Sequence, residues 1–383
     1  MSKRIFAFIL TLALLCAAIP SVRAEGLEIA APSAILMDAA TGTILFEKNA
    51  DERLPPASVT KVMTLLLVLE ALDCGRISRD DTVIASESAA AKGGSQVYLE
   101  VGEQMSMDEM LKSVVVSSAN DCATALAEHV AGSEAAFTEM MNRRAQELGL
   151  SDTHFVNCTG LDDEPDAAEH LTTAHDIAVI SRELLRHDEI RKYTTIWMDT
   201  VRGGKFGLSN TNKLVRFYEG TTGLKTGYTS TAGHCLSASA KRDGIELIAV
   251  VLHCASSAER FQSAKALLDY GFANYALASA DPDSPLQPIR VVLGTQESLT
   301  PVLQQTAPIL IEKGEQANIV RTVSVCEEVA APVSAGQQLG TLTLSAGERV
   351  LAEIPIIAPE AVPRLTLWEL TVRILRSACM GRE

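Results

Sequence analysis

The segment from residue 58 to residue 69 constrains the fold most, because it is apolar almost throughout and Lys61 is its only charged residue. Such a run is too long for one β-strand, and a helix with apolar side chains on every side has to be buried. The pair Pro55-Pro56 ends any regular structure just before it. The segment therefore predicts a helix that runs through the core of a domain, with Ser58 and Lys61 at its start.

Strand patterns open and close the region around this helix, and helical patterns lie between them. Residues 34–37 and 43–46 predict a hairpin, and residues 224–240 and 245–253 predict a strand pair that turns at Asp243-Gly244. Further helices are expected at 107–116, 121–131, 134–148, 173–187 and 259–275. The order predicts an α+β fold in which the first and last strands pair in one antiparallel sheet flanked by helices.

The pattern changes at residues 281–285, which have the composition of a linker. Short strand patterns recur beyond it, which predicts a small all-β domain, at 289–293, 309–311, 318–325, 341–344 and 349–357. Residues 364–378 are helical again, with a narrow polar arc and a broad apolar face that suit a membrane interface. A helix packed on its own domain, or a dimer helix, is the alternative. We expect domains at 25–278 and 286–359, and an amphipathic membrane-associating helix at 361–383.

The first 24 residues have the features of a secretory signal peptide. Lys3 and Arg4 precede the apolar run 5–19, and Val22-Arg23-Ala24 is a small-x-small cleavage site. The run is too short to span a bilayer, so a retained anchor is the weaker alternative. Cleavage removes three basic residues and no acidic one, so the formal net charge of −15 becomes −18. This charge argues against nucleic acid as a partner, because phosphate binding needs clustered Lys and Arg.

The cysteines and histidines do not form a metal motif. Seven cysteines follow the expected cleavage site, with no C-x-x-C pair and no Cys/His cluster at zinc spacing. His170 and His175 have no third ligand close in sequence, so neither a metal nor another cofactor is expected. With a turn at Asp243-Gly244, position 235 faces about 252, so we expect no bridge between Cys235 and Cys254.

The motif Ser58-Val59-Thr60-Lys61 places a hydroxyl and an amine on one helical face. A lysine at its reference pKa of about 10.4 is protonated, but desolvation favours the neutral form that a general base requires. Ser58 follows Pro-Pro-Ala and is expected at the helix N-terminus, where free amides and the helix dipole stabilise an oxyanion. The alternative is an N-cap serine followed by a lysine that extends into solvent.

Two other segments offer polar groups of the same kind. Ser118-Ala119-Asn120 lies between two helical patterns, and Asp121 is expected to cap the second. Lys225-Thr226-Gly227 lies in a strand followed by Tyr228, where an extended peptide can pair with the strand edge. Taken alone, the first is also a helix-cap sequence and the second an ordinary strand edge with a solubilising lysine.

These three motifs, in this order and at these separations, resemble the active-site motifs of the penicillin-binding proteins and serine β-lactamases. The wider segments 56–64, 157–161, 225–229 and 232–236 are similar to the low-molecular-weight D-alanyl-D-alanine carboxypeptidases. The similarity covers about residues 27–275 and implies a β-lactamase/transpeptidase-like catalytic domain. That family also has a β-rich C-terminal domain that ends in an amphipathic membrane helix.

The resemblance also implies roles for individual residues. Ser58 would be the acylated nucleophile and Lys61 its general base, with the backbone amides of Ser58 and Tyr228 as the oxyanion hole. Ser118 would relay protons with Asn120, which also holds the substrate's amide. Lys225 and Thr226 would lie near the terminal carboxylate of the substrate. Arg260 would pair with that carboxylate. The implied substrate-binding residues are Asn120, Lys225, Thr226, Gly227, Tyr228 and Arg260.

The function that follows from the resemblance is removal of the terminal D-Ala from peptidoglycan stem pentapeptides through an acyl-Ser58 intermediate, with β-lactams as covalent inhibitors. The location implied is the outer face of the bacterial cytoplasmic membrane. A serine β-lactamase is one alternative, but no Glu-x-x-Leu-Asn segment follows the second motif. A silent penicillin-sensing or wall-binding protein is another, but it would have lost a motif. The oligomeric state stays open.

Three residues depart from that family's usual pattern. Cys158 stands where a proline is more frequent, and Cys122 lies inside the helix after the second motif. Neither thiol is expected to take part in the chemistry. His234 is also unusual; we interpret it as structural, although an imidazole close to the cleft can influence pH dependence.

Overall fold

The structure, a computed structural model, describes residues 27–163, 166–305 and 307–379. The signal peptide expected at 1–24 lies outside the described residues. The segment that the sequence singled out begins with a short 3₁₀ helix, η1 (Ala57–Thr60), and continues as helix α2 (Lys61–Asp73). Every residue of α2 from Lys61 to Leu69 is buried, which confirms the predicted core helix.

A five-stranded antiparallel sheet lies beside this helix, in the order β2-β1-β9-β8-β7. Strand β1 pairs with β9, so the first and last strands of the sheet region meet as predicted. Asp243 and Gly244 both have positive φ in the β8–β9 turn, as a tight hairpin requires. Strand β7, which carries the third motif, is an edge strand. The strands are β1 (Ser33–Asp38), β2 (Ile44–Lys48), β7 (Thr221–Thr229), β8 (Gly233–Arg242) and β9 (Ile245–Cys254).

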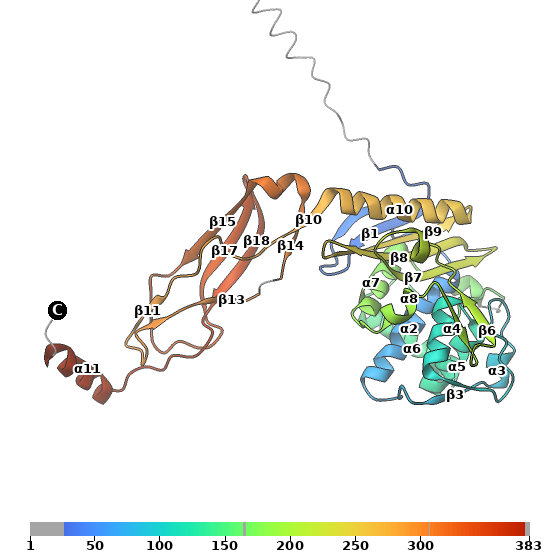
Figure 1. Ribbon diagram of the computed structural model, residues 1–383, viewed down its shortest axis with the longest axis horizontal. Coiled ribbons are helices and arrows are strands. Elements are labelled where there is room, and N and C mark those ends of the chain that lie inside the picture. The colour runs from blue at the N-terminus through green and yellow to red at the C-terminus, as the bar shows by residue number, and fades with distance from the viewer. Residues whose placement is uncertain (1–26, 164–165, 306, 380–383) are drawn as a thin grey trace, which may run out of the picture.

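Helices cover both faces of the sheet (Figure 1). Helix α10 (Ser257–Asn274) packs on one face, and its apolar core includes Leu36, Leu247 and Leu267. The other face carries α2 and the helices around it, with a larger core of Leu, Val, Met and Ala side chains. The surrounding helices are α4 (Met107–Val116), α5 (Asn120–Ala131), α6 (Glu134–Glu147) and α7 (Ala174–Leu185). Their positions confirm the predicted α+β arrangement.

Several short elements fill the stretches that the sequence left unassigned, because three to five residues show too little periodicity to predict a helix or strand. Residues 82–106 and 190–217 contain most of them. They are β3 (Thr82–Ile84), α3 (Glu87–Ala90), β4 (Gln104–Ser106), η2 (Ala167–Glu169), α8 (Ile190–Thr194), β5 (Met198–Val201), β6 (Phe206–Ser209) and α9 (Leu214–Phe217).

Beyond α10 the chain is mainly β-structure, which confirms the predicted all-β region. One correction concerns the strand predicted at 309–311, which was expected to belong to the small all-β domain. It forms as β14 (Ile309–Glu312), but it pairs with β10 (Tyr275–Ala278), directly after α10, and with neither of the two sheets that follow. The two sheets have the orders β12-β11-β16 and β13-β18-β17-β15. Their strands, with one 3₁₀ helix, are β11 (Ile289–Val292), β12 (Ser298–Leu299), β13 (Val302–Leu303), η3 (Lys313–Asn318), β15 (Ile319–Val325), β16 (Glu328–Ala330), β17 (Gln338–Ala346) and β18 (Arg349–Ile357).

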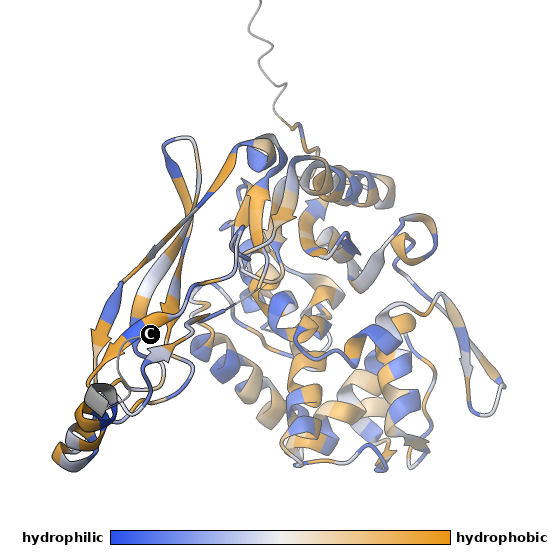
Figure 2. Ribbon diagram, turned by 60° about the vertical axis from the view of Figure 1, so that its left-hand side comes forward, coloured by the Kyte–Doolittle hydropathy of each residue, from blue (hydrophilic) through white to orange (hydrophobic). Residues whose placement is uncertain are grey.

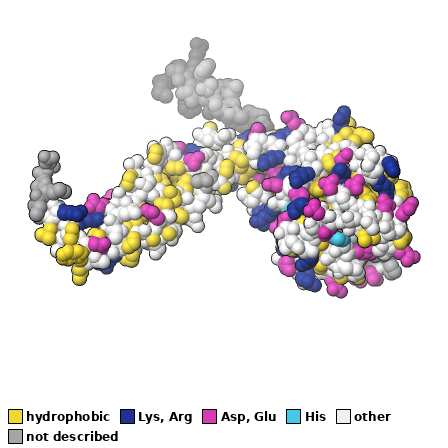
Figure 3. Space-filling view, turned by 60° about the horizontal axis from the view of Figure 1, so that its bottom comes forward, with side chains coloured by type: hydrophobic (Ala, Val, Ile, Leu, Met, Phe, Trp, Pro, Cys, Tyr) yellow, Lys and Arg dark blue, Asp and Glu magenta, His cyan; other side chains and the backbone are white. Residues whose placement is uncertain are grey.

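Helix α11 (Leu367–Cys379) follows this β-structure and lies at its far end from α2 and the helices around it (Figure 1). The Arg373 guanidinium donates to the carbonyls of Gly294 and Thr295, at 3.2 and 3.3 Å, and so ties the helix to the turn after β11. The ribbon of α11 contains hydrophobic residues (Figure 2), and exposed apolar side chains gather at this end of the molecule (Figure 3). They are Leu367, Trp368, Ile374 and Leu375. No helix within the described ranges has the length and apolarity needed to cross a bilayer.

Candidate active site

Ser58 lies in η1, in a turn whose backbone is held from behind. The Thr60 hydroxyl donates to the Ala57 carbonyl at 2.8 Å, and His170 Nε2 lies 2.8 Å from that hydroxyl. The Val156 amide donates to His170 Nδ1, so Nε2 carries the proton and donates to Thr60. Burial lowers the pKa of His170 to about 4, so the imidazole is neutral at pH 7. Both ring nitrogens are thus engaged in holding the turn that carries Ser58.

Gly160 lets the segment 157–161 pass directly against this turn. A Cβ on Gly160 would lie 1.9 Å from the Ala57 carbonyl oxygen, and the residue has a φ of +81°. The Asn157 side chain accepts hydrogen bonds from the Thr159 and Gly160 amides, at 3.1 and 2.7 Å, and so fixes the segment. The close contact positions the Thr159 carbonyl toward the start of α2.

Lys61 is fully buried and reaches three neutral acceptors. Its Nζ lies 2.9 Å from Ser58 Oγ, 2.6 Å from Asn120 Oδ1 and 2.7 Å from the Thr159 carbonyl. Burial lowers the pKa of Lys61 to about 7, against smaller opposing effects of Cys158 and Asp121. A neutral amine can keep its two N–H bonds to Asn120 and Thr159 and turn its lone pair toward the Ser58 hydroxyl. The arrangement can therefore activate Ser58 as a nucleophile.

The second motif lies between α4 and α5. Ser118 has a φ of +62° and is buried, and Asn120 is the first residue of α5. The Asn120 amide nitrogen donates to the Gly93 carbonyl at 2.8 Å, which orients its oxygen toward Lys61. The prediction that Asp121 caps α5 is wrong: its carboxylate accepts from the amides of Val97 and Leu99, at 3.1 and 3.0 Å. It therefore holds the 97–99 segment against the helix.

The third motif forms the β7 edge next to η1, which carries Ser58. A Cβ on Gly227 would lie 2.6 Å from the Pro56 carbonyl oxygen, so only glycine lets β7 approach η1 this closely. Lys225 is 1% exposed, which rules out a solubilising role, and its Nζ donates to the Thr226 carbonyl at 3.0 Å. Burial, with repulsion from Lys61 and Arg260, lowers the pKa of Lys225 well below its usual value. An anion bound beside Lys225 would offset the free-energy cost of keeping its buried ammonium group charged.

Thr226 and Arg260 lie at different parts of this edge. The Thr226 hydroxyl donates to the Thr211 hydroxyl at 2.6 Å, a contact that the sequence did not indicate. Arg260, from the start of α10, donates through Nη1 to the carbonyls of Gly227 and Cys235, at 2.9 and 3.3 Å. Tyr228 at the end of the motif is 60% exposed. The structure thus joins Ser58, Lys61 and Asn120 directly and brings the β7 edge beside them, with Arg260 bound to the backbone of that edge.

The sequence did not identify four of these supporting groups: the Thr159 carbonyl, Asn157, Thr211 and His170 in its contact with Thr60. The sequence Asn157-Cys158-Thr159-Gly160 is a turn signal, since Asn side chains bond to backbone amides two and three residues on. That signal could have identified the turn. Contacts between residues more than a hundred positions apart, such as Thr60 and His170, have no local signal.

The buried thiols lie outside this arrangement. Burial raises the pKa of Cys122 and of Cys158 well above the usual value, so both remain protonated at pH 7. The Cys158 thiol donates to Glu134 at 3.2 Å. Cys235 and Cys254 are free thiols that belong to the cores on opposite sides of the sheet, which confirms the prediction that they are not bridged.

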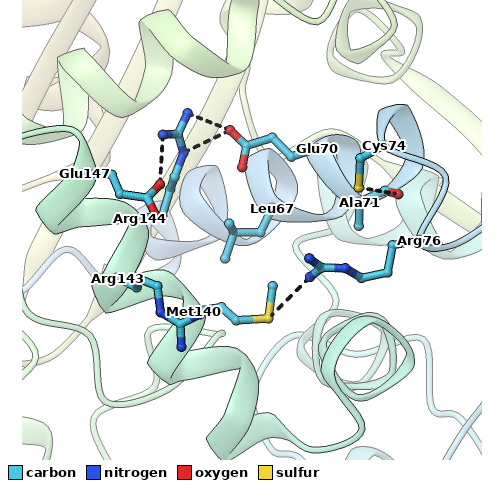
Figure 4. A pocket seen from close by; sticks show the side chains of 9 residues that line it. All are labelled: Leu67, Glu70, Ala71, Cys74, Arg76, Met140, Arg143, Arg144 and Glu147. Atoms are coloured by element: carbon cyan, nitrogen blue, oxygen red, sulfur yellow. Dashed lines mark hydrogen bonds and ion pairs between the residues drawn. The ribbon is translucent and has the colours of Figure 1, made fainter.

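A hollow with a volume of about 280 Å³ opens near the C-terminal end of α2, away from the three motifs (Figure 4). Arg144 bridges Glu70 at 2.8 Å and Glu147 at 3.2 Å across it, and Arg76 reaches the sulfur of Met140 at 3.8 Å. The Glu70 carboxylate ties Arg144 of α6 to α2, and Glu147 is a second partner of Arg144 on α6 itself, so the contacts of Arg144 are structural.

Comparison with known proteins agrees with this geometry. Residues 20–256 match the family described as D-alanyl-D-alanine carboxypeptidase, and residues 278–364 match the C-terminal domain of penicillin-binding protein 5. The chain is 42% identical over 335 residues to the D-alanyl-D-alanine carboxypeptidase DacF of Bacillus subtilis, covering 86% of this chain and 85% of that one. It is 33% identical over 337 residues to DacC of Escherichia coli, covering 86% and 83%.

A solved structure gives the same result for the fold. Penicillin-binding protein 5 from Haemophilus influenzae aligns with a TM-score of 0.75 at 31% identity, over 88% of this chain and 98% of that one. The matched family covers more than half of the chain, and the relatives align along most of their length. The chain therefore belongs to the D-alanyl-D-alanine carboxypeptidase family of low-molecular-weight penicillin-binding proteins.

Proposed function

We propose that this chain is a serine D-alanyl-D-alanine carboxypeptidase that removes the terminal D-Ala of peptidoglycan stem pentapeptides through an acyl-Ser58 intermediate. The observation that carries the proposal is the contact of 2.9 Å between Ser58 Oγ and the Nζ of Lys61. Burial brings the pKa of this lysine to about 7, so a large fraction of the amine is neutral at physiological pH.

In the acylation step Ser58 Oγ attacks the carbonyl carbon of the penultimate D-Ala and its proton passes to Lys61. The oxyanion accepts hydrogen bonds from the backbone amides of Ser58 and Tyr228. The C–N bond then breaks, and the departing D-Ala amine takes a proton through Ser118. Water then adds to the acyl-Ser58 ester and gives a proton to Lys61. The shortened peptide is released, and Ser58 Oγ regains its hydrogen.

Substrate orientation follows from the groups on the β7 edge. An extended peptide pairs with the backbone of that edge, and the Asn120 side chain binds its amide. Lys225, Thr226 and Arg260 recognise the terminal carboxylate. Arg260 carries a buried positive charge, and an anionic peptide end bound beside Lys225 would favour the protonated form of that lysine, so such a peptide binds even though the protein is strongly acidic overall.

The test is an assay of D-alanine released from diacetyl-Lys-D-Ala-D-Ala, run in parallel with intact-protein mass spectrometry after penicillin treatment. We expect D-alanine release and a covalent adduct on Ser58, both lost in Ser58→Ala. Rapid nitrocefin hydrolysis without D-alanine release would instead indicate a β-lactamase. An adduct without either turnover would indicate a penicillin-sensing protein, and no adduct at saturating penicillin would contradict the assignment.

We also propose that the mature protein is exported by cleavage after Ala24 and is held at the outer face of the cytoplasmic membrane by α11. Support comes from the exposed apolar side chains of this helix and from Trp368, a residue type that favours bilayer interfaces. Arg373 holds one side of α11 against the backbone of the β-structure. The exposed apolar side chains on the other parts of the helix therefore remain available to lipid. The helix would lie along the surface, with its basic residues near lipid headgroups.

Deletion of residues 364–383 is expected to move the protein from the membrane fraction to the soluble fraction without reducing D-alanine release. The reason is that the exposed apolar residues of α11 are removed while the site residues are all upstream. Flotation of both forms with vesicles of anionic phospholipid measures the partition. Equal flotation of the two forms would exclude α11 as the anchor.

A further inference from the structure

His234 lies beside the residues proposed to bind substrate, yet the proposed reaction gives it no role. It pairs with Tyr228 across strands β7 and β8, and the two rings stack with their centroids 4.4 Å apart and their planes at 28°. Tyr228 supplies one of the proposed oxyanion amides. The imidazole is therefore held at the edge of the site by a defined contact.

The Arg260 guanidinium is anchored next to this pair. Its Nη1 binds the carbonyls of Gly227 and Cys235, which are the chain neighbours of Tyr228 and His234. Arg260 is only 8% exposed, and its Nε is buried without a hydrogen-bond partner among the residues that the structure describes. The same holds for His234 Nδ1. Buried polar nitrogens are nearly always paired, so each of these two residues keeps a hydrogen-bonding capacity that the described residues leave unused.

The charges around the imidazole determine which group fits. Arg260 and Glu259 of α10 are close enough to act on the imidazole electrostatically. Tyr228 stacks on the ring from β7, and His253 precedes the strand partner of His234 on β9. Burial and the Arg260 charge lower the pKa of His234, and Glu259 opposes them. A substrate carboxylate bound at Arg260 would offset the Arg260 charge, which disfavours protonation of His234. The same carboxylate would accept a hydrogen bond from the His234 imidazolium.

We propose that His234 is a specificity-determining residue for substrates that end in a free carboxylate, because its imidazole takes up a proton when the carboxylate binds beside Arg260. This rests on the proposed function of the site. The imidazole binds its proton more tightly in the complex than in the free protein, so its pKa is higher in the complex. Linkage then requires the affinity for the substrate to rise as the pH falls through the interval between the two pKa values. A substrate whose carboxylate is replaced by an amide lacks this dependence.

The experiment uses the full chain carrying Ser58→Ala, which prevents turnover, and titrates it calorimetrically with diacetyl-Lys-D-Ala-D-Ala and with its C-terminal amide. At about pH 5.5 we expect the acid to bind roughly threefold to tenfold more tightly than at about pH 8, since one pKa unit corresponds to tenfold. Titrations in two buffers of different ionisation enthalpy count the protons taken up. The amide is expected to change less than about twofold, as no carboxylate is present.

Variants separate His234 from the other groups that titrate in this range. Adding His234→Gln, or His234→Tyr, which keeps an aromatic ring against Tyr228, should remove both the proton uptake and the pH dependence. Adding His253→Gln, a substitution on the neighbouring strand, should preserve them. Lys61 titrates equally in all these variants, so differences between them belong to the substituted histidine.

Unchanged pH dependence in both His234 variants would overturn the inference and leave the proposed function intact. Equal pH dependence for the acid and the amide would also overturn it, because the carboxylate would then not be the group sensed. Failure of the protein to release D-alanine from the acid before Ser58 is substituted would instead contradict the proposed function. The two failures are therefore distinguishable.

Discussion

Replacement of Lys61 by methionine is expected to lower kcat/KM for D-alanine release by about 10²–10⁴-fold, the usual contribution of a positioned general base. The methionine side chain fills similar space but has no lone pair to accept the Ser58 proton. Lys61→Arg should lose activity to the same extent, because a guanidinium stays protonated. Steady-state kinetics measure the loss, and near-ultraviolet circular dichroism verifies that each variant is folded.

The same residue sets the pH dependence of the wild-type enzyme. Burial lowers the pKa of Lys61 to about 7, and only the neutral amine acts as a base. The value of kcat/KM is therefore expected to rise with pH up to about 7, because the gain in neutral amine outweighs the smaller change in affinity attributed to His234. Lys241→Met, at an exposed position on β8, should leave both the rate and the profile unchanged. Less than tenfold loss in Lys61→Met would exclude Lys61 as the base.

Gly160→Ala is expected to lower kcat/KM by at least about 10²-fold, because small displacements of a catalytic group have effects of that size. The new methyl group would lie 1.9 Å from the Ala57 carbonyl oxygen and 2.7 Å from Thr60 Oγ1, in a residue with a φ of +81°. The turn that carries Ser58 has to move to make room. Kinetics with diacetyl-Lys-D-Ala-D-Ala and the thermal unfolding midpoint measure the two effects.

Gly132→Ala is a matched control for this substitution. Gly132 also has a left-handed backbone, with a φ of +84°, but nothing lies within 4 Å of the position of its Cβ. It should cost about 1 kcal/mol of stability through backbone strain, with kcat/KM within twofold of wild type. If both alanine variants lost activity equally, the contact between Gly160 and Ala57 would not be what positions Ser58.

The long elements of the fold were predictable because each carries its own periodic signal. Helix α4 spans the predicted residues 107–116, and the β8–β9 turn forms at Asp243-Gly244 as its composition indicated. The short elements between 190 and 217 were not predicted, because their structure depends on tertiary contacts. Arg202, which ties the β5–β6 turn to the Glu103 carboxylate and the Val97 carbonyl, is an example.

Within the candidate site, the residue types of the three motifs were visible in the sequence but their partners were not. The sequence indicated that Lys61 is desolvated, since no charge lies near it along the chain. It did not indicate that the Thr159 carbonyl is one of its acceptors, and it misassigned Asp121 as a helix cap. The Asp121 carboxylate accepts from the Cys122 amide of its own helix and from the amides of Val97 and Leu99, and only the packing brings that second segment within reach.

The sequence by itself determined the buried helix α2, the order of the three motifs and the division between a helix-rich and a β-rich part, because apolar periodicity and turn residues are local properties. The tertiary structure alone decided how Lys61 is shared among Ser58, Asn120 and Thr159. It also decided how the His234 ring stacks on Tyr228 next to the Cys235 carbonyl that binds Arg260. These contacts join segments far apart in the chain. They arise from the packing of the β7–β8 edge and its neighbours against α2 and α10, which no local pattern encodes.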